Sequence, residues 1–291
     1  MKNKFTCLFL LLVIFGSCGK KSENKKLTYQ NIVILSDLSS RLDNKTNKDF
    51  EEIHQLIKYF KDNCVQPGKK IGDRSSIAFM SFLGNDISKI DLNEFETTSD
   101  KQQFVNSKGK FENNGLENRI KQFDESIRKT YTDVRNPGLD LISSLMEKIK
   151  NGKIIKKDTL LINGIDTTFI KYENQLYIFT DGYLEYYNKA VNNQFYFGKN
   201  EIQKVRDYSE QTKSNVSTVI EKNKELGLTP YEHPNNSSIN LHVFETHERD
   251  KNDVLQTYKY VAGIRDNEIL EAVWSNWARK SGFKSFEWKK Y

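Results

Sequence analysis

The body of this chain contains almost no cysteine and little proline. Three cysteines and four prolines occur among 291 residues. Cys7 and Cys18 lie close to the N-terminus, so Cys64 alone remains in the body, and a disulfide framework is excluded there. Cys64 ends an amphipathic stretch that has no histidine near it in sequence, which favours a small semi-buried apolar residue over a catalytic thiol.

Neither sign of charge dominates the sequence. The 45 lysines and arginines are nearly matched by 39 aspartates and glutamates, which gives a formal net charge of +6. Nucleic-acid-binding proteins cluster basic residues on one face, so this even balance argues against a nucleic acid as partner. The sequence contains neither a His-Glu-x-x-His zinc pair nor a Gly-x-Ser-x-Gly elbow, and these two enzyme classes are not predicted.

The first residues have the pattern of a secretory signal. Two lysines precede an apolar run over residues 5–15, which is too short to span a bilayer comfortably. Small residues then lead into Cys18, and this ending resembles a bacterial lipoprotein signal peptide over residues 1–17. The resemblance implies that Cys18 becomes the lipidated, palmitate-bearing first residue of the mature chain. The family usually has leucine where Phe15 stands; the alternative is an ordinary cleaved signal with an incidental cysteine.

The residues after Cys18 are polar and rich in lysine. We expect residues 18–29 to form a flexible tether, and no later segment is long and apolar enough to cross a bilayer. Related lipoproteins with a glycine after the cysteine, here Gly19, usually reside in the outer membrane. The sequence therefore predicts a lipid-anchored protein of the cell envelope, on the outer membrane.

The remaining residues, 30–291, are predicted to form one domain in which strands and helices alternate. Short apolar runs predict buried strands at residues 32–36, 76–82, 176–180 and 239–244, with an antiparallel strand at 87–92. Helical spacing predicts helices at residues 48–63, 116–128, 137–150, 201–226 and around 270–277, before a terminal aromatic segment at 283–288. This alternation predicts an α/β fold with a doubly wound, mainly parallel sheet and helices on both faces.

An Asn-Gly pair marks an extra hairpin. Asn163 and Gly164 stand between two β-prone runs within residues 159–170, which is a strong signal for a two-residue hairpin turn. We expect this inserted hairpin to lead into the strand that ends at residue 180.

Two of the predicted strands end in acidic and hydroxyl side chains. Asp37 and Ser39 follow the first strand, and Thr180-Asp181-Gly182 closes a later one. Ligands of open α/β folds bind at the carboxyl edge of the sheet, so both strand ends are expected to share one site there.

These residues resemble the von Willebrand factor A (vWA) family. That family ends its first strand with Asp-x-Ser-x-Ser, brings a threonine on a second loop, and an aspartate on a third, usually within Thr-Asp-Gly. Asp37 and Ser39 match the first motif, Thr132 stands where the family has its threonine, and Asp181 matches the third loop. The resemblance implies that Asp37, Ser39, Thr132 and Asp181 hold Mg²⁺ or Mn²⁺, and that an acidic residue of a protein partner completes the shell.

One position departs from that family. Arg41 stands where the family has its second serine, and an arginine opposes a bound cation. Ser40 could take the missing role, Arg41 could turn to solvent, or the site could be metal-free, with Arg41 paired to Asp37 or Asp181. Asp37 and Ser39 could also simply cap the following turn.

Two functions are compatible with these patterns. The first is a membrane-anchored vWA-like module that binds a protein partner at the predicted edge, either through a divalent metal or at a metal-free site. The alternative is a metal-assisted hydrolase that uses the same carboxylates with water as the nucleophile. Because no general base or nucleophile is evident near the edge, the sequence favours the binding module.

Overall fold

The computed structural model describes residues 24–39, 46–68, 73–83, 87–133, 138–163, 166–187, 194–252, 254–259 and 263–290. Its contacts divide the chain into two compact units, a larger one of residues 28–157 and 172–291 and a smaller one of residues 1–27 and 158–171. In the described ranges, no helix has both the length and the apolar character needed to cross a bilayer. The sequence predicts one domain over residues 30–291, whereas the structure groups residues 158–171 with the N-terminal segment.

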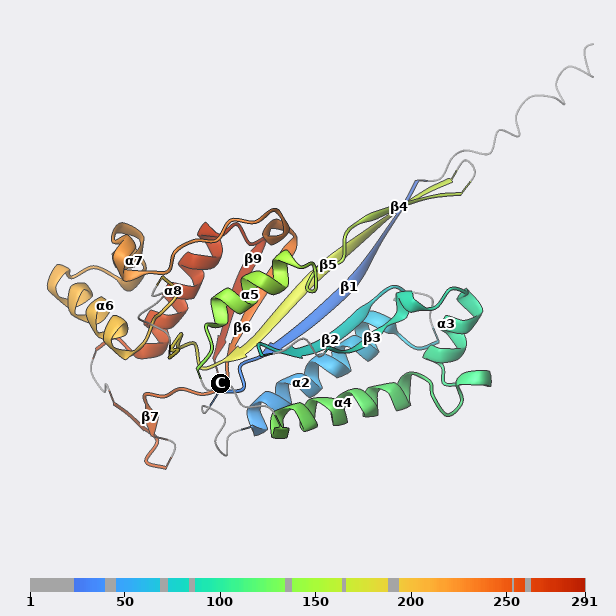
Figure 1. Ribbon diagram of the computed structural model, residues 1–291, viewed down its shortest axis with the longest axis horizontal. Helices are drawn as coiled ribbons and strands as arrows, with labels where there is room; N and C mark the ends of the chain where they lie inside the picture. The colour runs from blue at the N-terminus through green and yellow to red at the C-terminus, as the bar shows by residue number, and fades with distance from the viewer. Residues whose placement is uncertain are drawn as a thin grey trace, which may run out of the picture. The chain divides into compact units, whose positions relative to one another are not determined.

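The larger unit is built on a mostly parallel sheet whose strands follow the order β3-β2-β1-β5-β6-β9 (Figure 1). The strands are β1 Asn24–Ser36, β2 Ser76–Ser81, β3 Ile87–Asp91, β5 Asp166–Thr180, β6 Ile239–Glu245 and β9 Ser285–Lys290. β1 runs parallel to β2, β5 and β6 are parallel, and β6 is parallel to β9, while β3 is the antiparallel edge strand. A two-stranded sheet of β7 Lys251–Asn252 and β8 Thr257–Tyr258 lies apart from this order.

Helices cover both faces of this sheet. One hydrophobic core lies beneath α2 Asn47–Tyr59, its π-helical continuation η2 Phe60–Val65, α3 Thr98–Val105 and α4 Leu116–Asp133. The other lies beneath α5 Leu141–Lys150, α6 Lys199–Thr212, α7 Val216–Lys222 and α8 Asp266–Lys280. Short 3₁₀ turns complete the chain at η3 Leu92–Glu94, η4 Gly109–Phe111, η5 Lys224–Leu226 and η6 Pro234–Ser238. The α/β class and the mostly parallel sheet are confirmed, and they are consistent with a Rossmann-like fold.

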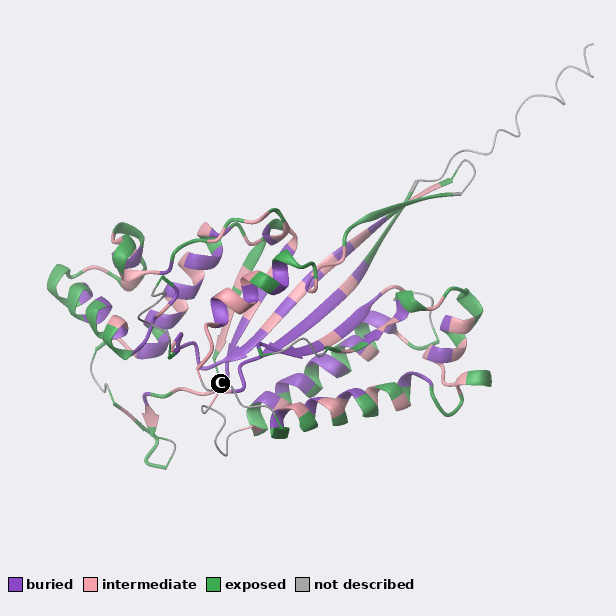
Figure 2. Cartoon of the chain, viewed as in Figure 1, coloured by how far each residue is buried: buried purple, intermediate pink, exposed green. Residues whose placement is uncertain are grey.

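The apolar run of β1 explains why a layer of helices is needed on each face of the sheet. Successive side chains of a strand point to opposite faces. Ile32 and Ile34 therefore join the core beneath α2 and α4, whereas Val33 and Leu35 join the core beneath α5 and α8, and all four are buried. Figure 2 shows buried residues running along the central strands, as expected for a sheet covered on both sides.

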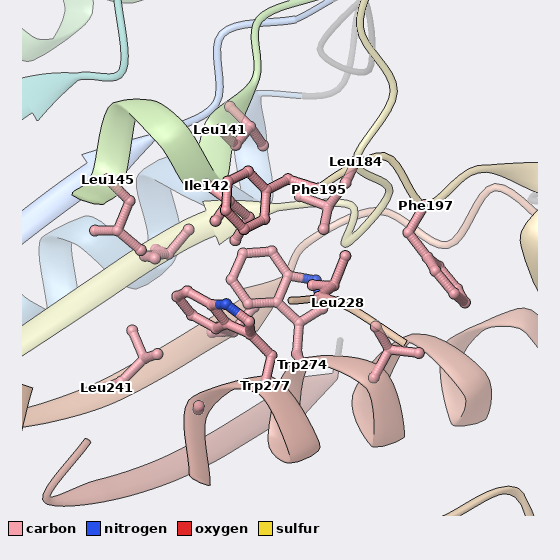
Figure 3. Packing of buried hydrophobic residues seen from close by; sticks show 14 of the residues in the cluster. Leu141, Ile142, Leu145, Leu184, Phe195, Phe197, Leu228, Leu241, Trp274 and Trp277 are labelled. Atoms are coloured by element: carbon pink, nitrogen blue, oxygen red, sulfur yellow. The ribbon is translucent and has the colours of Figure 1, made fainter. Parts of the chain in front are cut away.

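The second core is centred on two tryptophans of α8. Trp274 and Trp277 are fully buried, and their rings meet edge to face with centroids 5.8 Å apart. They extend from α8 toward the apolar side chains of α5, among them Ile142 and Leu145 (Figure 3). The helical spacing in the sequence around residues 270–277 predicts this buried face correctly.

Two predicted elements differ in the structure. The helix predicted over residues 201–226 is divided into α6, α7 and η5, because Lys213 adopts a left-handed backbone (φ 51°) and the Asn215 side chain accepts the Thr218 N–H at 2.8 Å to begin α7. The terminal aromatic segment is strand β9. The predicted helix start at Pro137 lies outside the described residues, and α5 begins after Asp140, which caps it.

The smaller unit contains a pair of antiparallel strands. β4 Thr159–Asn163 pairs with the beginning of β5, from Asn163 opposite Asp166 to Thr159 opposite Ile170. The first residues of β1 belong to the same unit.

A buried amide network fixes the register of three neighbouring strands, midway along β1 and β5 and at the first residue of β2. Asn31 of β1 donates to the Asn174 side chain of β5 at 2.7 Å and accepts the Ser76 hydroxyl of β2 at 2.9 Å. Asn174 also accepts the Lys156 N–H at 2.8 Å. Since both asparagines are buried, every one of these polar groups depends on its partner inside the protein.

We therefore expect Asn174→Ala to lower the free energy of unfolding by about 2–3 kcal/mol, because it removes one of the two acceptors of the Asn31 amide, the other being the Ile154 carbonyl, and the acceptor of the Lys156 N–H. Urea unfolding followed by circular dichroism measures the change. Asn200→Ala, at an exposed position in the first turn of α6, is the control and should change stability by less than about 0.5 kcal/mol. Equal effects of the two substitutions would contradict this account.

Candidate functional site

The predicted edge exists where β1 and β5 end side by side. The Asp37 N–H donates to the Phe179 carbonyl at 2.9 Å, one residue before the end of β5. The Asn31–Asn174 contact lies earlier along both of these strands, so β1 and β5 run in the same direction. Asp37 and Thr180 are thereby brought to one edge of the sheet.

Ser39 and Thr180, both in the described part of the chain, donate hydrogen bonds to the Asp37 carboxylate at this edge. Its Oδ1 accepts the Ser39 N–H at 3.1 Å, while its Oδ2 accepts the hydroxyls of Ser39 at 3.2 Å and Thr180 at 3.4 Å. Asp37 is 3% exposed and Ser39 is half-buried. We call Asp37, Ser39 and Thr180 the Asp37 cluster; it contains one carboxylate and two hydroxyls.

The loop after β5 is held tightly against α8 and β9. The Thr180 hydroxyl accepts the Gly182 N–H at 3.1 Å, and the Gly182 carbonyl accepts the Trp274 indole at 2.9 Å. Gly182 has φ +84°, and a Cβ at this position would lie 2.7 Å from the Trp288 ring. Glycine is therefore required here both by the backbone and by the available space.

Asp181 is neutralised by an arginine from the segment after β6. Its fully buried carboxylate accepts Arg249 Nε at 2.5 Å and the Tyr183 N–H at 3.1 Å. Arg249 also pairs with Glu185 at 2.5 Å and lies over the Tyr183 ring, 4.2 Å from its centroid. Asp181 is thus at the predicted edge, but it is engaged in an ion pair.

A second arginine holds the segment that carries Arg249. Arg265 donates to Glu248 at 3.0 Å and to Asp250 at 2.8 Å, and it lies over the Tyr258 ring at 3.6 Å. An open hollow of about 650 Å³ adjoins this segment, with Arg249, Asp250 and Tyr258 in its wall. The hollow gives the edge a concave flank in which charged and uncharged residues are mixed.

Thr132 is placed differently from the sequence expectation. It lies in the last turn of α4 with an exposed side chain, and its hydroxyl donates to the Arg128 carbonyl at 3.0 Å. The residue of α4 that reaches the strand ends is Tyr131, whose buried hydroxyl lies 2.5 Å from Ser36 Oγ and donates to Asp49 at 2.7 Å. Among the described contacts, none joins Thr132 to the Asp37 cluster.

The other predicted site residues cannot be placed. Ser40, Arg41 and the lipidation residue Cys18 lie outside the described residues. One interpretation of the sequence is that Arg41 is the counter-ion of Asp37 or Asp181. In the structure Arg249 forms an ion pair with Asp181, and no local sequence motif identifies Arg249 as its partner.

Glu245 is a further acidic residue at the edge, which the sequence motifs do not identify. It ends β6 directly opposite Thr180 and is 1% exposed, with its carboxyl accepting the Trp288 indole at 3.1 Å. Burial, followed by the negative charge of Glu248, raises the pKa of Glu245 to about 8. Glu245 therefore keeps its proton at neutral pH.

The donor atoms of the Asp37 cluster suit a hard cation. Within the described part of the chain, no group of three or more His, Cys, Asp or Glu side chains could hold a metal ion. Adjacent oxygens around Mg²⁺, with bonds of about 2.1 Å, lie about 3.0 Å apart. The Asp37–Ser39 and Asp37–Thr180 separations of 3.2 and 3.4 Å are close to that spacing. One carboxylate and two hydroxyls are thus the hard oxygen donors that Mg²⁺ or Mn²⁺ prefers, and the two separations from the carboxylate are compatible with one ion.

Comparisons with known proteins give no identification. No protein-family model matches this chain, and no curated protein matches its sequence significantly.

Removing Arg249 should be costly. We expect Arg249→Met to lower the free energy of unfolding by about 3 kcal/mol, because it leaves the buried Asp181 charge without its partner. Arg279→Met is the matched control, since Arg279 pairs with Glu221 on the surface with both side chains 61% exposed, and such pairs contribute less than about 1 kcal/mol. Chemical denaturation of both variants tests this; similar losses would rule out a special role for Arg249.

We expect the folding stability to decrease as the pH rises, because of Glu245. Below pH 4.5 both the folded and the unfolded chain carry the proton; between 4.5 and about 8 the unfolded chain releases it while the folded chain retains it. Folding stability from this group is therefore lost as pH rises through that window, by on the order of 4 kcal/mol. Glu245→Gln should remove this loss, so unfolding curves of the variant and the native chain should differ above pH 8 and converge below 4.5. A constant difference at all pH values would contradict the assignment.

Proposed function

We propose that this protein is a membrane-tethered binding module. In this proposal a vWA-like domain, anchored to the outer membrane of the cell envelope through lipidated Cys18, binds a protein partner at the carboxyl edge of its sheet. The strand order supports the choice of edge. Numbered along the chain, the sheet strands other than the hairpin strand β4 have the order 3-2-1-4-5-6, and ligands of such sheets bind where that order reverses, between β1 and β5.

One observation carries the proposal: the convergence of Asp37, Ser39 and Thr180 at that reversal point. In the proposed site these three side chains hold Mg²⁺ or Mn²⁺. The ion supplies a positive charge to which a carboxylate of the partner can bind. Thr180 takes the place that the sequence resemblance gives to Thr132, and the hairpin of β4 and β5 is an insertion relative to the family.

The hollow beside Arg249 supports a protein as the partner. Its wall combines charged residues with the turn between β7 and β8, where Val254 is 90% exposed. Interfaces between proteins join such polar rims to a few apolar contacts. A partner that places its acidic residue on the Asp37 cluster would meet this hollow at the flank of the site.

A metal-assisted hydrolase is the second candidate, and Glu245 is the observation that favours it. A carboxyl group with a pKa near 8 has the proton affinity that a general acid needs at neutral pH. Against this function stands the burial of Glu245 beneath the Trp288 indole. Phosphoester and peptide substrates test the alternative; turnover that is lost in Asp37→Asn and in Asp181→Ala would favour the hydrolase over the binding module.

Mg²⁺ should stabilise the native chain. At a free concentration about ten times the Kd, the linkage contributes about 1.4 kcal/mol, which thermal unfolding detects as a higher Tm. We expect Asp37→Asn and the isosteric Thr180→Val to abolish the rise. Thr132→Val, which removes a hydroxyl bonded to its own helix, should leave the rise unchanged.

Three results would contradict parts of this proposal. If millimolar Mg²⁺ and Mn²⁺ leave the Tm of the native chain unchanged, the metal-binding part of the proposal is wrong. If Thr132→Val abolishes the response, Thr132 rather than Thr180 completes the site.

For the partner, affinity capture from solubilised envelopes with the native chain and with Asp37→Asn should show a protein retained with Mg²⁺ and lost with EDTA or with the variant. Retention by both chains would rule out this edge as the binding surface.

A further inference from the structure

The hairpin of the smaller unit presents an apolar face to solvent. Leu160 lies directly opposite Phe169, and Ile162 follows two residues later on the same side of β4. These three side chains are 55%, 39% and 71% exposed. We call Leu160, Ile162 and Phe169 the hairpin face.

Such a face requires an explanation. A two-stranded ribbon in water normally carries polar residues on its exposed side, because exposed apolar groups gain nothing from folding there. Contiguous exposed apolar residues mark surfaces that meet a protein or a membrane. On the other side of the ribbon Leu161 is exposed as well, which adds to the apolar character of the hairpin.

The position of the predicted lipid anchor in the sequence favours a membrane, rather than a protein, as the surface that the hairpin face meets. Only five residues separate Cys18 from Asn24, the first residue of β1, so the two are six residue steps apart. At no more than about 3.5 Å per residue, this segment spans at most about 20 Å. The start of β1 and the hairpin belong to one compact unit. A lipidated Cys18 would therefore keep the hairpin close to the bilayer surface.

The charge of the connecting segment agrees with a membrane surface. Residues 18–27 contain four lysines and one glutamate. Basic residues next to an anchor are attracted to anionic lipid headgroups, by about 1 kcal/mol each when they lie at the surface. Apolar and basic groups near one anchor are the combination by which peripheral proteins bind the interface.

We propose that the hairpin face inserts into the interfacial layer of the membrane that holds Cys18, as a second point of attachment; this rests on the lipid anchor of the proposed function. The outer backbone edge of β4 limits the depth, since unpaired backbone groups are too costly in the hydrocarbon core. Two attachment points restrict how the smaller unit can turn on the membrane, which a single flexible tether cannot do.

The test uses the full lipidated chain in phosphatidylethanolamine–phosphatidylglycerol vesicles. Ile162→Cys and, as control, Val254→Cys are each labelled with an environment-sensitive fluorophore; both sites are exposed, and Val254 lies in the larger unit. Buried Cys64, whose pKa burial raises to about 12, should react little. We expect doxyl-labelled lipids to quench the label at position 162 several-fold more than the label at position 254.

Each outcome decides the inference. Equal quenching at the two positions overturns it and leaves the anchor intact. Protection of position 162 from aqueous iodide without quenching by doxyl lipid also overturns it, because a protein then covers the face. Incorporation of a palmitate analogue, compared with Cys18→Ala, reports on the anchor separately. If Cys18 carries no lipid, the proposed anchor fails, and the inference falls with it.

Discussion

The pairing of β1 with β5 is the constraint on which the candidate site depends. The chain leaves β1 toward α2 on one face of the sheet, and it leaves β5 toward α6 on the other. Connections that diverge in this way open a crevice between the two strand ends. The bond from the Asp37 N–H to the Phe179 carbonyl closes the pair, so the hydroxyls of Ser39 and Thr180 can both reach one carboxylate.

The electrostatics of the edge follow from a second, long-range contact. Arg249 compensates the buried charge of Asp181, and Arg265 fixes the segment on which Arg249 lies. The loops after β5 and β6 are therefore joined by ion pairs, while Glu245 avoids a charge by keeping its proton. Buried carboxyl groups at one sheet edge thus meet different environments: Asp181 is paired with an arginine, whereas burial raises the pKa of Glu245.

Local patterns predict the parts of this structure that depend on local chemistry. The strand ends at Asp37 and Thr180 follow from short apolar runs, because the length of such a run and its β-branched and aromatic residues favour a buried strand. The placement of Thr132 did not follow. The apolar spacing of Phe123, Ile127 and Tyr131 carries α4 past the expected end at Arg128, and this turns Tyr131 rather than Thr132 inward. Glu245 reaches the edge through the register of β6 against β5, and Arg249 reaches it from the loop after β6; no short motif encodes either placement.

The ion pair of Arg249 with Asp181 affects the charge of the proposed site and therefore its attraction for an acidic group of a partner. With Asp181 neutralised, Asp37 supplies the negative charge of the Asp37 cluster, and the two hydroxyls add none. A divalent cation held by one carboxylate keeps about one positive charge, and Mg²⁺ prefers six oxygen ligands. If Asp181 faced the cation as well, the charge would be balanced, and a further carboxylate would gain little. In the proposed site, the ion pair between Arg249 and Asp181 is therefore what makes the bound ion attract a carboxylate from outside the chain.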